Sequence, residues 1–148
     1  MKFKHKVDKW IHAMTLLKSK RIPCLPNIIR NIIRIVYACD IALDTDIDKT
    51  STLMHNGLGT VIGKGSKIGR NVTIYQNVTL GGNGRSVGNG KPIIENDCIL
   101  YAGSMVLGEV SVGEHSIIGA NSVVLESIPP YSLAVGTPAK VVKTLSKE

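Results

Sequence analysis

The stretch from residue 93 to residue 124 reads IIENDCILYAGSMVLGEVSVGEHSIIGANSVV, and it repeats with a period of six. The repeated aliphatic positions are Ile94, Leu100, Val106, Val112, Ile118 and Val124. A period of six fits neither a helix, with about 3.6 residues per turn, nor a simple alternating strand. It fits a coil in which each hexad supplies one short strand and one turn, so that three hexads complete a triangular rung. The sequence therefore predicts stacked rungs that pair as parallel strands, with the aliphatic residues facing inward.

The same rhythm extends toward the N-terminus. It includes Ile41, Ile47, Leu53, Ile62, Ile68, Ile74 and Leu80. Aliphatic stacks need few large rings, which agrees with an aromatic content of only 4% beside 43% hydrophobic residues. We therefore expect residues 40–129 to form one all-β coil that carries the function.

Two interruptions break this rhythm. Leu53 and Ile62 are nine positions apart, three more than one hexad, and Leu80 and Ile94 are fourteen apart, two more than two hexads. The second interruption is rich in glycine, and we predict that residues 81–92 protrude as a loop. Loops on a rigid scaffold often carry function, although a tolerated insertion would look the same.

The segments on either side of the coil lack the six-residue period. Residues 1–39 are expected to form two short helices separated near Pro23 and Pro26. The apolar positions of the first are Val7, Trp10, Ile11, Met14 and Leu17. The second is expected to line one face with Ile28, Ile29, Ile32, Ile33 and Val36. Residues 130–148 are expected to leave the coil at Pro129–Pro130 as a C-terminal extension.

Length and composition exclude several classes of protein. A chain of 148 residues accommodates one domain and a short extra segment. No uncharged apolar run reaches the ~18 residues of a membrane span, and no signal-peptide core follows the N-terminal residues. The three scattered cysteines do not suggest a disulfide framework or a zinc site. We therefore expect a cytoplasmic protein.

The net charge of +7 comes from the N-terminal segment, since residues 1–40 hold nine Lys or Arg and two Asp. A solvated basic helix pair explains it, and so does attraction of residues 1–39 to an anionic membrane surface. Nucleic-acid binding is not expected, because aromatic stacking residues and known motifs are missing.

The chain resembles the hexapeptide-repeat acyltransferases, and among them the serine O-acetyltransferases most closely. The matching stretches are residues 40–41, 54–55, 78–82, 119–124 and 136–140. This resemblance implies a left-handed parallel β-helix that assembles as a homotrimer. It also implies acetyl-CoA as cosubstrate, lying in the groove between neighbouring coils, and transfer of its acetyl group to a hydroxyl acceptor.

The catalytic histidine of the family corresponds to His55 and its orienting aspartate to Asp40. The chemistry requires such a pair independently, because an alcohol must lose its proton as it attacks a thioester. Imidazole titrates near neutral pH, and a carboxylate on its other nitrogen fixes the tautomer. Without the repeat, a polar surface residue would explain His55 as well.

The resemblance also suggests which residues bind acetyl-CoA. Backbone groups near Gly81 and Gly82 are candidates for contacting the thioester or pantetheine. The candidates along the groove are Ala102, Gly103, Gly119 and Ala120, with Lys140 near a phosphate. Turn geometry alone would also account for the small residues.

Two positions depart from the serine enzymes at the acceptor site. The family's aspartate before the catalytic histidine is Met54 here, and its histidine before a proline is Lys91. L-serine therefore remains open beside a saccharide hydroxyl, as in polysaccharide O-acetyltransferases.

Other functions remain as alternatives. A non-catalytic coil that serves as an assembly module would not bind acetyl-CoA. Hexapeptide coils that bind zinc need three histidines, and the coil of this chain holds only His55 and His115, so no metal is expected.

Overall fold

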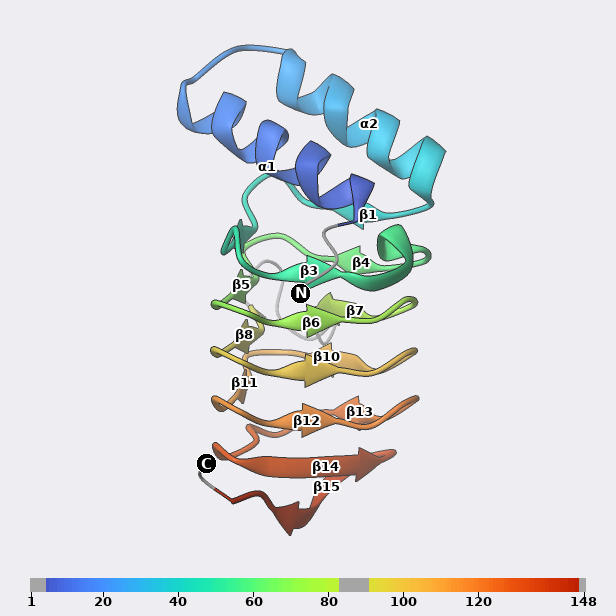
Figure 1. Cartoon of the computed structure of the whole chain (residues 1–148), viewed down its shortest axis with the longest axis vertical. Helices are drawn as coiled ribbons and strands as arrows, with labels where there is room; N and C mark the ends of the chain where they lie inside the picture. Colours follow the sequence, from blue (N-terminus) through green and yellow to red (C-terminus); the bar gives the residue numbers. More distant parts are fainter. Residues whose placement is uncertain (1–4, 83–90, 147–148) are drawn as a thin grey trace.

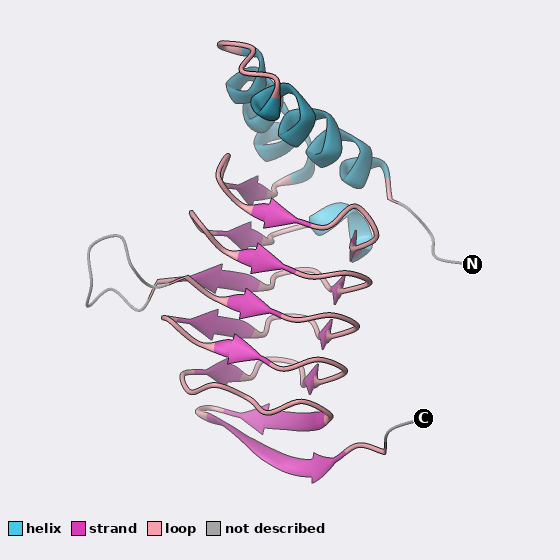
Figure 2. Ribbon diagram, turned by 90° about the vertical axis from the view of Figure 1, so that its left-hand side faces the viewer, coloured by secondary structure: helices cyan, strands magenta, loops and turns pink. Residues whose placement is uncertain are grey.

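The computed structural model describes residues 5–82 and 91–146, and it is a three-sided prism of short stacked strands with two helices across one end (Figures 1 and 2). The chain winds around the prism and visits the three faces in turn, so each strand pairs with strands one rung away. This arrangement confirms the predicted coil of parallel strands.

Three sheets form the faces, which we name A, B and C. Face A contains β1 (Asp40–Ile41), β4 (Val61–Ile62), β7 (Thr79–Gly81), β10 (Met105–Leu107) and β13 (Val123–Val124). Face B contains β2 (Asp46–Ile47), β5 (Lys67–Ile68), β8 (Ile93–Ile94) and β11 (Ser111–Val112). Face C contains β3 (Thr52–Leu53), β6 (Thr73–Ile74), β9 (Ile99–Leu100), β12 (Ile117–Ile118), β14 (Ser132–Gly136) and β15 (Ala139–Thr144).

The interior consists of the aliphatic stacks that the hexads predict. On face C the column is Leu53, Ile74, Leu100, Ile118 and Ala134, and each of these side chains is buried. Each aliphatic side chain thus packs on its counterpart in the next rung. Burying a side chain of this size stabilises a fold by about 1.5–3 kcal/mol.

The first interruption of the rhythm becomes a turn that leaves the prism intact. Partners in a regular rung, such as Ile62 and Leu80, are 18 positions apart, whereas Ile41 and Ile62 are 21 apart. The additional residues fall where the short helical turn η1 (Met54–Gly57) joins face C to face A. Of the predicted loop 81–92, Gly81 ends β7, and residues 83–90 lie outside the described residues.

The N-terminal segment forms α1 (Lys6–Ser19) and α2 (Leu25–Tyr37), as expected. Only Pro26, Ile29 and Ile33 of α2 are buried, while Ile28 and Val36 are 52% and 63% exposed. The expected five-residue apolar face is therefore wrong, since α2 lies across the end of the coil and buries a narrower stripe. Within the described ranges, neither helix has the length and apolar character needed to cross a bilayer.

The C-terminal segment departs from its expected exit at Pro129–Pro130. β14 pairs in parallel with β12 and adds one more strand to face C, and β15 returns antiparallel along β14. The prolines lack N–H groups, but parallel pairing resumes just beyond them, where the Gly119 N–H donates to the Ala134 carbonyl. The hairpin covers the end of the prism opposite the helices (Figure 1).

Candidate active site

His55 lies in the turn that joins β3 to β4, and its side chain is exposed. His55, Asn56 and Gly57 have φ values of 54°, 56° and 69°. Histidine and asparagine tolerate this left-handed region better than most residues. A Cβ on Gly57 would lie 2.9 Å from Cys39 Sγ, so only glycine fits there. The three-residue insertion thus builds a tightly constrained turn that presents one imidazole outward.

Two tyrosines follow His55 along the same edge of the prism. We call this edge, where face C turns into face A, the His55 edge; it comprises residues 54–60, 75–78, 101–104 and 119–122. The Tyr75 ring centroid is 6.4 Å from that of His55 and 5.1 Å from that of Tyr101. The sequence interpretation missed both tyrosines. Each directly follows an inward aliphatic residue, as Met54 follows Leu53, and this shared position in the repeat was the available signal.

Asp40 begins β1 on face A, where its carboxylate contacts α2. Arg30 donates to Asp40 Oδ1 from Nη2 at 2.9 Å, and Arg34 Nη1 lies 4.0 Å from Oδ2. Among the described residues there is no hydrogen bond between Asp40 and His55. The structure therefore places Asp40 in an ion pair with α2, and its pairing with the imidazole stays a prediction.

The predicted pantetheine residues Ala102, Gly103, Gly119 and Ala120 all lie on the His55 edge. Gly103 has a φ of +71°, and a Cβ on Gly119 would lie 2.7 Å from Val135 Cγ1. Packing within the chain therefore already requires both glycines.

The remaining predicted contacts lie elsewhere on the prism. Gly82 and Lys91 stand where face A turns into face B, and Lys91 lies over Gly65 beside a groove of about 420 Å³. Gly81 ends a strand of face A, and a Cβ there would meet no atom within 4 Å. Lys140 donates to Glu126 at 3.1 Å on the surface. A single protomer therefore does not bring these residues to His55.

The His55 edge also holds buried polar atoms that lack partners. Asn56 Oδ1 and Gln76 Oε1 are buried without a hydrogen bond among the described residues. Leaving a buried acceptor unpaired costs about 1–3 kcal/mol, so such atoms often mark functional sites. Met54, the neighbour of His55, is only half-buried.

Two of the three cysteines are buried and poorly suited to nucleophilic attack. Burial raises the pKa of the Cys39 thiol to about 12, and burial likewise raises the pKa of the Cys98 thiol to about 12. Since the thiolate is the reactive form, neither side chain is prepared to attack an acyl group. Cys24, at the start of α2, is exposed.

Alkylation of the native protein at pH 8 is expected to modify Cys24 alone. Peptide mass spectrometry after iodoacetamide treatment should detect Cys39 and Cys98 adducts only when denaturant is present, because burial keeps both thiols protonated. Modification of Cys39 at the rate of Cys24 in the native protein would contradict this assignment.

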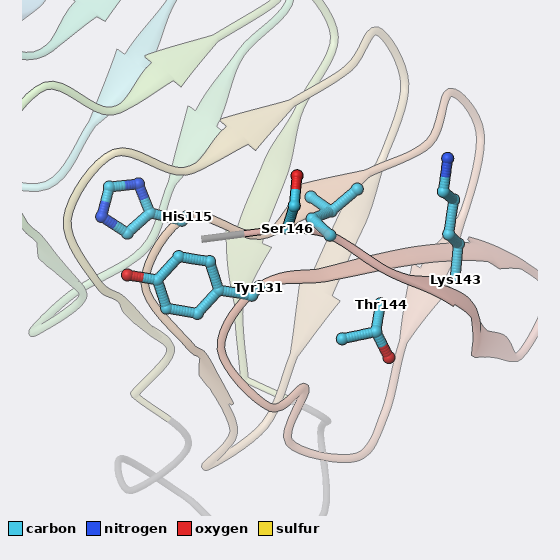
Figure 3. Close-up of a pocket in the computed structure, with 6 residues that line it drawn as sticks. His115, Tyr131, Lys143, Thr144 and Ser146 are labelled. Carbon is cyan, nitrogen blue, oxygen red and sulfur yellow. The ribbon is translucent and has the colours of Figure 1, made fainter. Parts of the chain in front are cut away.

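The pocket in Figure 3 lies away from His55, where face B turns into face C. It has a volume of about 570 Å³ and is lined by His115, Tyr131, Lys143 and neighbouring residues. The exposed His115 ring stacks on Tyr131 with their centroids 4.8 Å apart. Within residues 5–82 and 91–146, no three His, Cys, Asp or Glu side chains gather as a metal site requires. We therefore centre the candidate site on His55.

The chain has clear relatives among known proteins. Residues 91–126 match the family model described as bacterial transferase hexapeptide (six repeats). Serine acetyltransferase of Bacillus subtilis is 39% identical over 134 residues, which cover 90% of this chain and 61% of that protein. The chain thus spans about three-fifths of the length of this relative.

Solved structures share the same fold. A serine acetyltransferase from Brucella abortus in complex with coenzyme A has a TM-score of 0.88 at 28% identity, covering 93% of this chain and 55% of that one. A soybean serine acetyltransferase complexed with serine has a TM-score of 0.85 at 35% identity, covering 92% and 56%. These similarities confirm the predicted left-handed β-helix.

Proposed function

Because this chain belongs to the hexapeptide-repeat acyltransferase superfamily and is most like serine O-acetyltransferase, we propose that it moves an acetyl group from acetyl-CoA to the hydroxyl of L-serine. The observation that carries this proposal is the exposed imidazole of His55, which the three-residue insertion holds outward beside the small residues of the His55 edge.

His55 serves as the general base in the proposed mechanism. The imidazole accepts the proton of the acceptor hydroxyl as the oxygen attacks the thioester carbonyl carbon. The carbon–sulfur bond then breaks, the acetyl ester remains on the acceptor, and the imidazolium returns its proton to the departing thiolate. Asp40 is proposed to orient the imidazole. Direct transfer is favoured over an acyl-enzyme because Cys39 and Cys98 are buried with raised pKa values.

Acetyl-CoA supplies the activated acetyl group. The residues proposed to hold it are Ala102, Gly103, Gly119 and Ala120, whose small side chains let a long, narrow ligand lie against the backbone. The unpaired Gln76 Oε1 on the same edge supports this choice, because it leaves an acceptor without a partner beside the proposed groove. The exposed pair of Lys140 and Glu126 is weak enough to open toward a phosphate.

A homotrimer is proposed to complete the site. Lys91 and Gly82 stand on a different edge from His55 within one protomer. If the His55 edge of one protomer faces the edge between faces A and B of its neighbour, these residues join the imidazole in a shared cleft. The apolar outward side chains of face A, including Val61 and Met105, support burial against a neighbouring coil.

Cytoplasmic location and peripheral membrane contact through residues 1–39 belong to the proposal as well. The unpaired cysteines support a reducing compartment. The exposed Ile28, Ile35 and Val36 of α2, near basic Arg34, suit the surface of an anionic membrane.

An acceptor screen tests the proposed function. Coenzyme A release should require an acceptor, with L-serine giving the highest kcat/KM among serine, simple sugars and acidic sugars. The resemblance to serine enzymes favours serine although Met54 and Lys91 replace their acceptor-binding residues. Turnover with a saccharide but not with serine would refute the assigned acceptor. Absence of both acetyl-CoA binding and release would instead support a structural coil.

A further inference from the structure

Asp8 is a buried carboxylate on α1 that the proposed mechanism does not use. Asp8 is only 3% exposed, and its side chain lies beside β3 rather than in solvent. Oδ1 accepts the Leu53 N–H at 3.1 Å. Oδ2 accepts the His5 N–H at 3.0 Å and the Thr52 hydroxyl at 3.3 Å. Asp8 therefore ties α1 to the strand that leads into η1.

The Leu53 N–H needs this carboxylate because the coil ends there. β3 is the edge strand of face C, so it has a strand neighbour on only one side. On that side the backbone N–H of Thr52 donates to the Val72 carbonyl. The Leu53 N–H points away from that neighbour and would be a buried donor without a partner. Asp8 takes the place of the next rung.

This contact fixes the entrance of the turn that presents His55. The exit is already held by the coil, since the Gly59 N–H donates to the Ala38 carbonyl and the Asn77 N–H to the Leu58 carbonyl, at 2.9 and 2.8 Å. The residues between have left-handed backbone conformations, which persist only when the surroundings impose them. The Asp8 contact lies two residues before His55 and supplies the constraint on the entry side.

We propose that Asp8 is a positioning residue for His55, holding the imidazole in its outward geometry through the backbone of Leu53. This inference depends on the proposed function only in naming His55 as the base. Among the described residues Asp8 has no hydrogen bond to the His55 side chain, so its effect passes through the backbone. A shift of about 1 Å in a reacting group costs up to about 10²-fold in rate.

Asp8→Ala and Asp8→Asn test this proposal in the full chain. Both should lower kcat about tenfold or more while the KM for acetyl-CoA changes less than about twofold, since the residues proposed to hold the cofactor lie two or more rungs from the turn of His55. Asp8→Asn should retain more activity than Asp8→Ala, because its amide oxygen still accepts the Leu53 N–H.

Met14→Ala is the matched control. Met14 is 2% exposed on the same helix and packs in the hydrophobic core without a hydrogen bond to the turn, so this variant lowers the melting temperature but should keep its kcat. If the Asp8 variants lose no more kcat than Met14→Ala, Asp8 is a structural cap and the proposal is overturned. The same holds if their only effect is a higher KM for acetyl-CoA.

Nuclear magnetic resonance separates failure of this proposal from failure of the proposed function. The His55 ring signals should shift and broaden in Asp8→Ala and stay in place in Met14→Ala, whether or not the wild-type protein turns over serine. Unchanged His55 signals in Asp8→Ala would overturn the positioning role. An inactive wild type with shifted His55 signals would refute only the acceptor or the reaction.

Discussion

His55→Ala is expected to lower kcat by on the order of 10²-fold or more with L-serine as acceptor, the scale of general-base catalysis. The loss should appear in kcat and leave acetyl-CoA binding intact, because the imidazole acts on the acceptor hydroxyl. Steady-state coenzyme A release and calorimetric binding of acetyl-CoA measure the two effects separately. Asp40→Asn should show a smaller loss in kcat, since it removes an orienting charge and leaves the base.

His115→Ala provides a closely matched control for this prediction. His115 is also exposed, and its φ of 57° is almost that of His55, but it lies at the edge between faces B and C. Both substitutions place alanine in the same strained backbone region and remove one surface imidazole. Equal turnover of His55→Ala and the wild-type protein would remove His55 from the chemistry.

Leu100→Ala is expected to destabilise the coil by about 2–5 kcal/mol, the range for removing a fully buried leucine side chain. Leu100 is 0% exposed and stacks between Ile74 and Ile118 on face C. For a chain of this size, each kcal/mol lowers the melting temperature by about 2–4 °C. Thermal unfolding at one fixed protein concentration measures the effect, since oligomers melt in a concentration-dependent way.

Ile99→Ala is the control for that variant. Ile99 precedes Leu100 on the same strand and is only half-buried, because successive side chains of a strand point to opposite faces. We expect its effect to be clearly smaller. Equal losses at the two positions would contradict the assignment of inward and outward residues by the six-residue period.

Stability as a function of pH should reveal the buried charge of Asp8. Burial raises the pKa of this carboxyl above its ordinary value of 3.8, so the unfolded chain gives up the proton first. Its contribution to stability is therefore present below that value and lost as the pH rises through the folded pKa. As the pH rises above about 4, the free energy of unfolding of wild type should fall relative to that of Asp8→Asn.

Denaturant unfolding at each pH measures that difference. The ionisable groups coupled to Asp8 are His5 and Cys39, and both are unchanged in Asp8→Asn, so the difference isolates the carboxyl. A relative stability of wild type that rises with pH would contradict the buried-charge interpretation.

The six-residue rhythm was sufficient to predict the coil and its inward columns. Leu80 and Val106 needed no structural information, because a hexad fixes which residues point inward. The three-residue excess before Ile62 marked the turn of His55 as well. The prediction of the buried face of the second helix was less accurate, because that helix contains more apolar residues than the end of the coil can cover.

The sequence by itself determined the architecture, since this follows from a short-range period that each hexad repeats, and its resemblance to the serine enzymes indicated His55 as the candidate base. Only the tertiary structure revealed that Asp8 caps Leu53, that Arg30 binds Asp40, and that Tyr75 and Tyr101 accompany His55. Those contacts join an unrepeated helical segment to the coil, or join one rung to the next. Their partners depend on how the helices lie across the end of the prism and on how edge side chains turn, which no period encodes.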